Sequence, residues 1–364
     1  MKTLANGQAY QEIWNVSSFF DLEGELISVE PHGNGHINRT YMLCSTTGKR
    51  YILQKLSDAF DIEKLMANVS SVITYIKEHF DPSSTMNLVY TKNGKSYHHD
   101  ENGDYRVFDF VEHSKVLQNA ETAEDFYQSA IAFGSFQNML ADFPAETLSE
   151  PIVNFHNTID RYRIFHETLE RDPMGRAKEV EEEIAFVLSE EEEAGTLQRM
   201  RESGQLPLRV THNDTKLNNV LLDKESGKPI CVIDLDTVMP GLSVYDYGDS
   251  IRFGASTALE DEQDLSKVLL DLDLFRIYTK GFLEACPNLT EEEIAMLPMG
   301  AKIMTLECGV RFLTDHIDGD HYFNIHKEGQ NLDRARTQFK LVQEMEAHWD
   351  EMHSIVKELA ARIR

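Results

Sequence analysis

The sequence predicts an α+β protein with two lobes, a small one built on an antiparallel sheet plus a helix and a larger, mainly helical one. Three observations predict this class. With 364 residues, 41% of them hydrophobic, the chain can bury two cores, because one domain commonly takes about 150 residues. Short segments with strand character and turn signals fill the first part of the chain. Helical periodicity dominates from residue 123 onward.

The small lobe is expected to hold a sheet of short strands. They are predicted at residues 25–31, 39–45, 50–56, 88–91, 96–99 and 105–112. Turn signals separate several of them, namely Thr-Thr-Gly-Lys at residues 46–49 and Asn-Gly pairs at 93–94 and 102–103. Between the third and fourth strands, residues 61–80 carry apolar side chains at helical spacing. This spacing predicts a helix that flanks the sheet.

The remainder of the chain is expected to form the larger lobe. We place the boundary near His113, so that residues 1–112 form the first lobe and residues 113–364 the second. Helices are predicted at residues 123–140, 157–171, 177–203, 260–285, 291–297, 302–317 and 332–363. Thr290 followed by Glu293 has the pattern of a capping box at one helix start.

Composition excludes several classes of function. The net charge of −27 argues against a nucleic-acid partner, whose phosphates require a basic surface. No segment approaches the roughly 20 apolar residues of a membrane span, and the N-terminal residues lack the apolar core of a signal peptide. We therefore expect a cytoplasmic protein with no membrane partner. The four cysteines are scattered without a Cys-x-x-Cys pair, which suggests neither a disulfide framework nor a zinc site.

The segment 209–236 carries the functional groups that phosphoryl transfer needs. A hydroxyl group that attacks the γ-phosphate of ATP needs a proton acceptor, and the nucleotide needs Mg²⁺ held by hard oxygen ligands. Asp214 would be the acceptor, while Asn219 and Asp234 would offer an amide oxygen and a carboxylate. Each residue alone is also typical of an ordinary turn. The joint pattern favours kinase chemistry.

Two short strands would bring these oxygen atoms together. Residues 219–222 and 230–233 are expected to pair as a hairpin, joined by the polar segment 223–229. One hairpin would thus build most of the site.

The motif resembles a known superfamily. His212-x-Asp214-x4-Asn219, followed by an apolar strand into Asp234, is similar to the aminoglycoside phosphotransferase and choline kinase superfamily, which shares its fold with protein kinases. More narrowly, the segments 211–221 and 232–241 resemble the bacterial N-acetylhexosamine 1-kinases. The superfamily resemblance spans nearly the whole chain. It implies a bilobal protein-kinase-like fold with the catalytic hairpin in the larger lobe.

The resemblance assigns roles around this hairpin. Asp214 would accept the proton of the substrate, and Asn219 and Asp234 would bind Mg²⁺. Asp236 would be a second metal or substrate carboxylate, or would simply begin the following loop. Lys216 would stabilise the charge that develops during transfer, or would be a solvated loop residue.

Two further residues are expected to support the catalytic loop. His212 would brace the loop through hydrogen bonds of its ring nitrogens rather than titrate during catalysis. Asp249 matches the structural aspartate that ties the loop down in the superfamily. Neither residue is expected to act on the substrate.

The nucleotide would be held by the small lobe. Gly33 and Gly35 lie in the loop 31–38, where glycine lets the backbone approach phosphates, although two glycines taken alone are better explained by a plain turn. Phe110 and Glu112 fall where kinases place the hinge that binds adenine.

One departure from the superfamily concerns the third strand. Many relatives end it with a lysine or arginine that contacts the nucleotide phosphates. Here Gln54 occupies that position, and strand alternation puts Lys55 on the opposite face. Either Gln54 acts as a neutral donor, a bulge redirects Lys55, or another cation takes over.

The acceptor would lie beside Asp214. His36, Arg311 and Tyr322 are in segments similar to those that line the sugar site of the hexosamine kinases, and they offer the donors, acceptors and aromatic face that a sugar needs. Arg311 could instead form an ion pair with Glu307, one helical turn earlier.

The expected activity is ATP- and Mg²⁺-dependent phosphorylation of a small-molecule sugar. The resemblance indicates the anomeric hydroxyl of N-acetylglucosamine or N-acetylgalactosamine, with a sugar 1-phosphate as product. Other acceptors remain open, such as choline, homoserine, an aminoglycoside or another sugar. A catalytically silent nucleotide-binding protein is the alternative from a different class.

Overall fold

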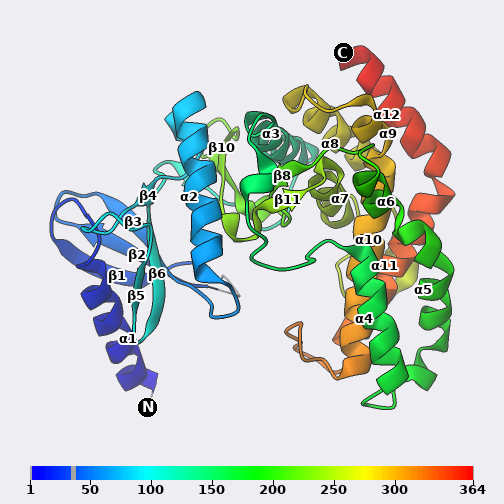
Figure 1. Cartoon of the computed structure of the whole chain (residues 1–364), viewed down its shortest axis with the longest axis horizontal. Coiled ribbons are helices and arrows are strands. Elements are labelled where there is room, and N and C mark those ends of the chain that lie inside the picture. The colour runs from blue at the N-terminus through cyan, green and yellow to red at the C-terminus, as the bar shows by residue number, and fades with distance from the viewer. Residues whose placement is uncertain (1, 34–37, 364) are drawn as a thin grey trace.

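The chain folds into two lobes that lie side by side along its longest axis (Figure 1). The computed structural model describes residues 2–33 and 38–363. One lobe holds an antiparallel sheet with two helices, and the other is mainly helical and contains short paired strands. This arrangement confirms the predicted α+β, protein-kinase-like fold class.

The small lobe contains a six-stranded antiparallel sheet. The strand order is β1-β2-β3-β6-β4, with β5 paired to β6. The bounds are Leu26–Pro31 (β1), Arg39–Ser45 (β2), Arg50–Lys55 (β3), Leu88–Val89 (β4), His98–Asp100 (β5) and Gly103–Asp109 (β6). The predicted strands are therefore confirmed, with shifts of a few residues at their ends.

Two helices cover opposite faces of this sheet. In β6, Tyr105 and Val107 pack in the cluster that contains apolar residues of α1 (Lys2–Ser17), whereas Phe108 packs with α2 (Ile62–His79). The alternation follows from the two-residue period of a strand. The helix α2 was predicted. The helix α1 was not, because Asn-Gly at residues 6–7 interrupts any clear apolar period.

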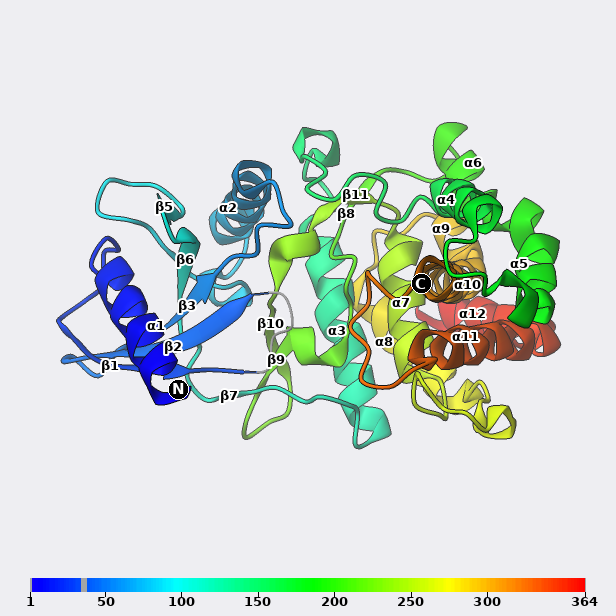
Figure 2. The ribbon, with the colours of Figure 1, turned by 90° about the horizontal axis from the view of Figure 1, so that it is seen from below.

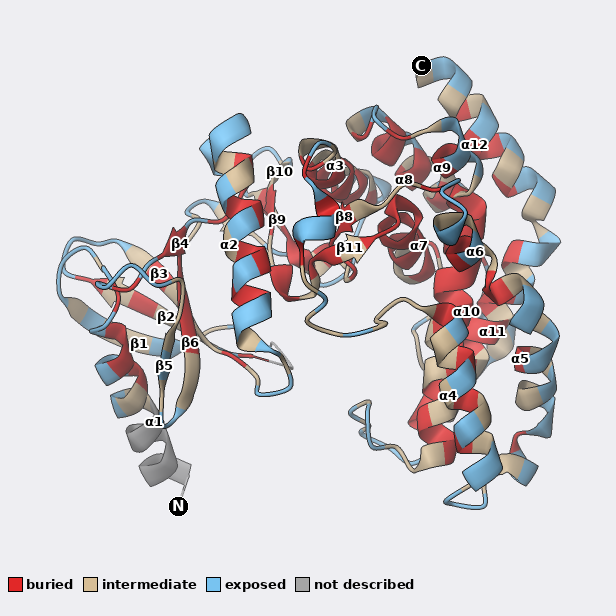
Figure 3. Ribbon diagram, in the orientation of Figure 1, coloured by how far each residue is buried: buried red, intermediate tan, exposed pale blue. Residues whose placement is uncertain are grey.

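The large lobe is built around one long buried helix, α10. Figure 3 shows α10 and its neighbour α7 as mostly buried. The bounds are Ala123–Met139 (α3), Thr158–Arg171 (α4), Glu181–Ala194 (α5), Thr196–Glu202 (α6), Ser243–Gly254 (α7), Leu272–Ala285 (α8), Glu291–Ala295 (α9), Leu297–Asp318 (α10), Gln330–Ala347 (α11) and Trp349–Ile363 (α12). The capping box of Thr290 and Glu293 is confirmed at the start of α9.

Three predicted helices differ from the structure. Residues 177–203 form two α-helices that meet at Gly195, and residues 332–363 divide at His348. The helix predicted at 260–285 begins only at Leu272, because the side chain of Asp271 caps it by accepting the backbone N–H groups of residues 273 and 274. The helix α7 was not predicted as a helix.

Short strand pairs position the functional segment. The catalytic hairpin consists of β9 (Val220–Asp223) and β10 (Pro229–Val232), which pair antiparallel as predicted. It lies between the small lobe and α3 (Figure 2). The strand β7 (Ser114–Lys115) pairs with β9, and β8 (Arg209–Thr211) pairs with β11 (Met239–Gly241).

The two lobes share packed contacts along α2. Apolar residues of α2 belong to the same buried cluster as those of β9 and β10. From α2, Asn68 donates to the carbonyl oxygens of Ser149 (2.8 Å) and Val238 (2.9 Å), and its own oxygen accepts the Ser149 N–H (3.0 Å). These bonds fix α2 on the larger lobe. No described helix has the length and apolar character needed to cross a membrane.

Candidate active site

The predicted base and its neighbours lie together in the loop between β8 and β9. The Oδ1 atom of Asp214 lies 3.1 Å from the Nζ atom of Lys216. The other carboxylate oxygen, Oδ2, accepts a hydrogen bond of 3.0 Å from Nδ2 of Asn219, which also donates to the backbone oxygen of Asp214 at 2.8 Å. The carboxylate of Asp214 is thus held between a cation and an amide.

The charge of Lys216 is preserved by its surroundings. Burial lowers the pKa of Lys216, but the carboxylates of Asp214 and Asp249 outweigh burial and raise that pKa above its ordinary value. The ammonium group therefore remains charged beside the predicted base.

The loop brings Asp234 close to Asn219. The N–H of Ile233 donates to the Asn219 carbonyl oxygen at 2.9 Å, and Asp234 follows with a left-handed φ of 59°. The Asp234 side chain is accessible to solvent and makes no hydrogen bond or ion pair with any described residue. Protein nevertheless surrounds it on most sides. This desolvation, together with the like charge of Asp236, raises the pKa of Asp234 to about 6.

These residues fit a divalent cation. The carboxylate of Asp234 is unpartnered within the described part of the chain and is repelled by other carboxylates, including that of Asp214. A doubly charged ion would offset that repulsion, and carboxylate and amide oxygens are the ligands that Mg²⁺ prefers. Asn219 uses its Nδ2 for Asp214, which leaves its amide oxygen as a possible second ligand.

The carboxylate of Asp236 is engaged elsewhere. Its Oδ1 atom lies 2.5 Å from Nη1 of Arg106, and its Oδ2 accepts a hydrogen bond of 2.6 Å from Nδ2 of Asn38. Both partners belong to the small lobe. Asp236 therefore contacts the small lobe with both oxygens, whereas Asp234 leaves its carboxylate free.

The sequence analysis did not identify Arg106. This arginine is fully buried in β6, with 1% of its surface exposed. The available signal was a single cation between apolar neighbours in the strand Tyr-Arg-Val-Phe, on the face opposite to Tyr105 and Val107. It is the cation that stands beside Gln54, since its Nε donates to the Gln54 side-chain oxygen at 2.9 Å.

Two carboxylates of α7 anchor the backbone of the catalytic loop. Asp246 accepts the backbone N–H groups of His212 (2.9 Å) and Asn213 (2.8 Å), and Asp249 accepts that of Thr215 (3.1 Å). The sequence pointed to Asp249 alone, so Asp246 is an additional loop anchor. Burial raises the pKa of Asp246.

His212 braces the loop as expected. Its Nε2 donates to the carbonyl oxygen of Ile233 at 2.9 Å, and its Nδ1 accepts the backbone N–H of Asp214 at 3.3 Å. Phe133 and Phe136 pack edge-on against the ring. The ring therefore ties the predicted base to the end of β10.

The predicted nucleotide residues have different surroundings. Gly33 has a φ of 72°, and Gly35 lies outside the described residues. Lys55 lies on the face opposite to Gln54, where its Nζ pairs with Glu12 of α1 at 2.7 Å. A bulge that redirects Lys55 is therefore not observed, and β3 pairs with both neighbours in unbroken register.

The hinge segment is ordered by Arg50. The Arg50 guanidinium lies 4.1 Å from the centre of the Phe110 ring, and its Nε donates to Glu112 at 2.9 Å. The backbone N–H of Phe110 donates to the Arg50 carbonyl oxygen at 3.0 Å, which leaves it unavailable to adenine.

The predicted acceptor residues Arg311 and Tyr322 contact one another. Nη2 of Arg311 lies 3.2 Å from the Tyr322 hydroxyl oxygen. Three aromatic rings surround the guanidinium at 5.4–5.5 Å, and they belong to Phe155, Tyr322 and Phe323. His36, the third predicted acceptor residue, lies outside the described residues.

The alternative ion pair between Arg311 and Glu307 is not formed. Glu307 instead accepts from His156 Nδ1 (2.8 Å) and from the Thr158 hydroxyl (2.7 Å). The other ring nitrogen of His156 lies 3.3 Å from the carbonyl oxygen of Asn213. Through His156 and the adjacent Phe155, the aromatic cage of Arg311 is connected to the catalytic loop.

A carboxylate in α10 anchors the loop that carries Tyr322. Asp315 accepts the backbone N–H groups of residues 321, 322 and 323 at 2.8–2.9 Å. Tyr322 itself is 67% exposed. Asp315 was not predicted as a functional residue, because its hydrogen bonds depend on a turn of the chain that no sequence motif indicates.

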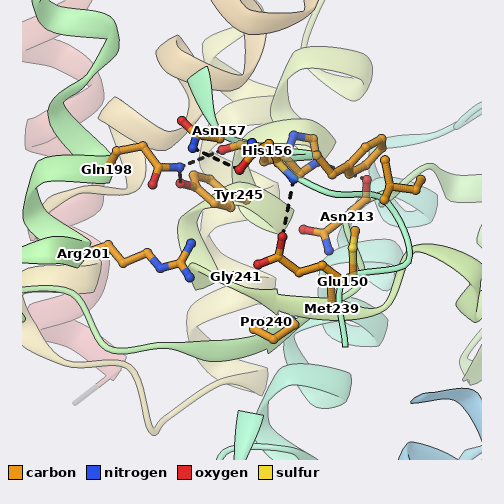
Figure 4. A pocket seen from close by; sticks show the side chains of 13 residues that line it. Glu150, His156, Asn157, Gln198, Arg201, Asn213, Met239, Pro240, Gly241 and Tyr245 are labelled. Atoms are coloured by element: carbon orange, nitrogen blue, oxygen red, sulfur yellow. Dashed lines mark hydrogen bonds between the residues drawn. The ribbon is translucent and has the colours of Figure 1, made fainter. Parts of the chain in front are cut away.

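Two cavities border the catalytic loop. Figure 4 shows the smaller one, about 40 Å³, lined by Asn213, Gln198 and Tyr245 among others. It can hold only water-sized molecules. The larger one, about 490 Å³, borders the loop at Thr215 and includes Arg252 in a lining that mixes hydroxyl groups with aromatic rings. Its size admits a sugar-sized molecule.

The sequence profile of the phosphotransferase enzyme family, APH, matches residues 28–272 of this chain. The chain belongs to this phosphotransferase family. The match covers nearly all of the small-lobe sheet, the catalytic hairpin and α7, and it ends before the segment that carries Arg311 and Tyr322.

Solved structures support the same fold for this phosphotransferase. A microcompartment-associated aminopropanol kinase is similar with a TM-score of 0.65 and 14% identity, covering 94% of this chain and 98% of that one. The amicoumacin kinase hAmiN, solved with AMP-PNP, Ca²⁺ and Ami, is similar with a TM-score of 0.60 and 14% identity. The similarity covers 95% of this chain and 96% of that one. The choline kinase LicA from Streptococcus pneumoniae is similar with a TM-score of 0.53 and 16% identity. The similarity covers 94% of this chain and 99% of that one.

Proposed function

We propose that this phosphotransferase transfers the γ-phosphoryl group of ATP to the anomeric hydroxyl of N-acetylglucosamine or N-acetylgalactosamine, with Mg²⁺ as cofactor. The observation that carries the reaction type is the position of Asp214, between Lys216 and Asn219 and near the free carboxylate of Asp234. The small lobe, residues 1–112, would bind the nucleotide. The remainder would bind the acceptor and perform the transfer.

The chemistry follows from these side chains. Asp214 accepts the proton of the attacking hydroxyl as the new oxygen–phosphorus bond forms and the bond to ADP breaks. Lys216 stabilises the negative charge that develops on the transferring group. Asp234 and the Asn219 amide oxygen hold the metal, which when bound neutralises phosphate charge and orients the nucleotide. No covalent enzyme intermediate is needed.

The guanidinium of Arg311 favours one class of acceptor. Its guanidinium has no carboxylate partner within ion-pair distance in the described part of the chain, and aromatic rings hold it in place. A fixed cation repels a cationic amine but donates well to hydroxyl and carbonyl oxygens. Together with the exposed ring of Tyr322, it suits an N-acetyl sugar better than choline or an aminoglycoside.

An amino alcohol is the second candidate. The net charge of −27 would attract a cationic acceptor. Two of the similar structures are described as aminopropanol and choline kinases. At 14% and 16% identity these proteins share the fold with this chain, and fold is a poor guide to the acceptor.

An acceptor panel separates the candidates. ADP formation is measured with N-acetylglucosamine, N-acetylgalactosamine, glucose, galactose, choline, ethanolamine, homoserine and an aminoglycoside, each at several concentrations. The proposal predicts the highest kcat/KM for the two N-acetylhexosamines. Turnover confined to amino alcohols would exclude the sugar assignment, and ATP binding without turnover on any acceptor would favour a silent nucleotide-binding protein.

A further inference from the structure

A row of polar side chains crosses the small-lobe sheet and ends beside Asp236, in the segment that follows the catalytic hairpin. Thr40, Gln54 and Arg106 are register partners on the adjacent strands β2, β3 and β6. Gln54 donates to the Thr40 hydroxyl at 3.3 Å and accepts from Nε of Arg106 at 2.9 Å. Register partners on neighbouring strands lie on the same face. The sheet therefore fixes the direction of the Arg106 guanidinium.

The guanidinium at the end of this row contacts the other lobe. Its Nη1 lies 2.5 Å from Oδ1 of Asp236, and the two side chains have 1% and 6% of their surface exposed. Met66 of α2 and the Phe108 ring pack against the same guanidinium. Nearly all of the pair is thus removed from solvent, so it forms a joint between the lobes rather than a surface that could take a ligand.

The acid at this joint is fixed by a second residue of the small lobe. Asn38 donates to Oδ2 of Asp236 at 2.6 Å, and its own side-chain oxygen accepts the backbone N–H of Ser57 at 3.0 Å. Asp236 therefore has an ion-pair contact at Oδ1 and a hydrogen bond at Oδ2. Asp234, two residues earlier, has its carboxylate free of any described hydrogen bond or ion pair.

We propose that Arg106 is a positioning residue: through Asp236 it fixes the small lobe over the catalytic hairpin, and it thereby excludes Asp236 from the metal site. The lysine expected on β3 is replaced by Gln54, which orients Arg106 instead of contacting phosphate. This buried arginine–carboxylate pair then adds to the contacts of Asn38 and Asn68 in coupling the nucleotide lobe to the segment that carries Asp234. Removal of one partner leaves the other charge buried and unpaired.

The inference rests on the proposed use of a metal–nucleotide complex, but its test needs no acceptor. The charge-neutral double variant R106M/D236N removes the joint without leaving a lone buried charge. The dissociation constant of AMP-PNP is measured by calorimetry with and without Mn²⁺. The ratio of the two dissociation constants measures how much bound Mn²⁺ strengthens nucleotide binding, and it therefore depends on the metal ligands. The constants themselves depend on how well the two lobes are held together.

Clear results are expected for each variant. R106M/D236N should weaken AMP-PNP binding about tenfold both with and without Mn²⁺, while the ratio stays within about threefold of wild type. D234N should bring the ratio towards one. R106K keeps the charge but loses the forked group that contacts Gln54 and Asp236 together, so it should restore only part of the affinity lost in the double variant. R276M/E358Q, which removes an exposed arginine–carboxylate pair between α8 and α12, should change neither quantity.

Two results would overturn the proposal. A ratio that collapses in R106M/D236N as it does in D234N would make Asp236 a metal ligand. Unchanged AMP-PNP affinity in the folded double variant, or in R106K, would show that the pair does not position the nucleotide lobe. If the double variant fails to fold, R106K alone decides: a partial loss of AMP-PNP affinity that is equal with and without Mn²⁺ supports the joint, and wild-type-like binding or a collapsed ratio contradicts it. Lack of turnover on sugars affects none of these readouts.

Discussion

The carboxylate of Asp214 lies 3.1 Å from the ammonium group of Lys216, and the amide of Asn219 holds its other oxygen. An unprotonated carboxylate in this position can receive a proton from an attacking hydroxyl, and the neighbouring cation can meet the charge that forms on the phosphoryl group. In the proposed reaction, two residues of a short loop would thus provide complementary functions.

Replacement of Asp214 by Asn should remove the proton acceptor while the shape of the side chain is kept. We expect kcat to fall by about 10²–10⁴-fold, with the affinity for ATP within a few-fold of wild type. Steady-state kinetics and calorimetric nucleotide binding measure the two effects separately. A kcat within a few-fold of wild type would show that Asp214 is not the base.

Lys216 should act on the transition state more than on substrate binding. K216M is expected to reduce kcat by about 10²-fold, with little change in the KM for either substrate, and K216R should recover part of the loss. The kinetic constants of the three proteins are compared at saturating ATP. A change in KM alone, with kcat preserved, would assign Lys216 to ground-state binding.

Asp234 should destabilise the metal-free protein at neutral pH. Its pKa is raised from 3.8 to about 6, so between these values the folded state retains a proton that the unfolded state has released. Stability due to this group is therefore lost as pH rises from 3.8 to about 6. After allowance for solvent screening, D234N should stabilise the metal-free protein by about 1 kcal/mol above pH 6.

The measurement for this prediction is thermal unfolding in EDTA between pH 4.5 and 7.5. The melting temperature of D234N should exceed that of wild type by about 2–4 °C at pH 7.5, and the difference should shrink towards pH 4.5. Added Mg²⁺ and ATP should raise the melting temperature of wild type more than that of D234N. A pH-independent difference would contradict the titration of Asp234.

Arg311 should distinguish acceptors. R311M is expected to raise the KM for N-acetylglucosamine by about tenfold, because a fixed donor to the sugar is lost, and to leave the KM for ATP unchanged. Y322F is a milder variant that removes the hydroxyl contacted by Arg311. If R311M instead improves turnover of choline and leaves the sugar unaffected, the guanidinium acts only by repelling cations.

Local patterns in the sequence were sufficient for part of this account. The hairpin was predicted because β9 and β10 are apolar, close in sequence and joined by turn residues. The roles proposed for Asp214, Asn219 and Asp234 were predicted from the spacing of these residues in the sequence. The strands of the small lobe were predicted for the same reason. All of these features depend on neighbours along the chain.

The features that were missed depend on distant partners. Strand alternation places Arg106 on one face of β6 but does not reveal Asp236 across the lobe boundary. The helix α7 was missed because every residue from Ser243 to Arg252 is buried, and a helix buried all round shows no apolar period. The contact between Asp246 of α7 and the catalytic loop was therefore not predicted.

The central claim is tested most directly by phosphorus NMR of a reaction that contains the protein, ATP, Mg²⁺ and N-acetylglucosamine. One sugar 1-phosphate signal should grow in equal amount with ADP, and no such signal should appear with D214N. Equal product formation by D214N, or phosphate on a hydroxyl other than the anomeric one, would contradict the central claim.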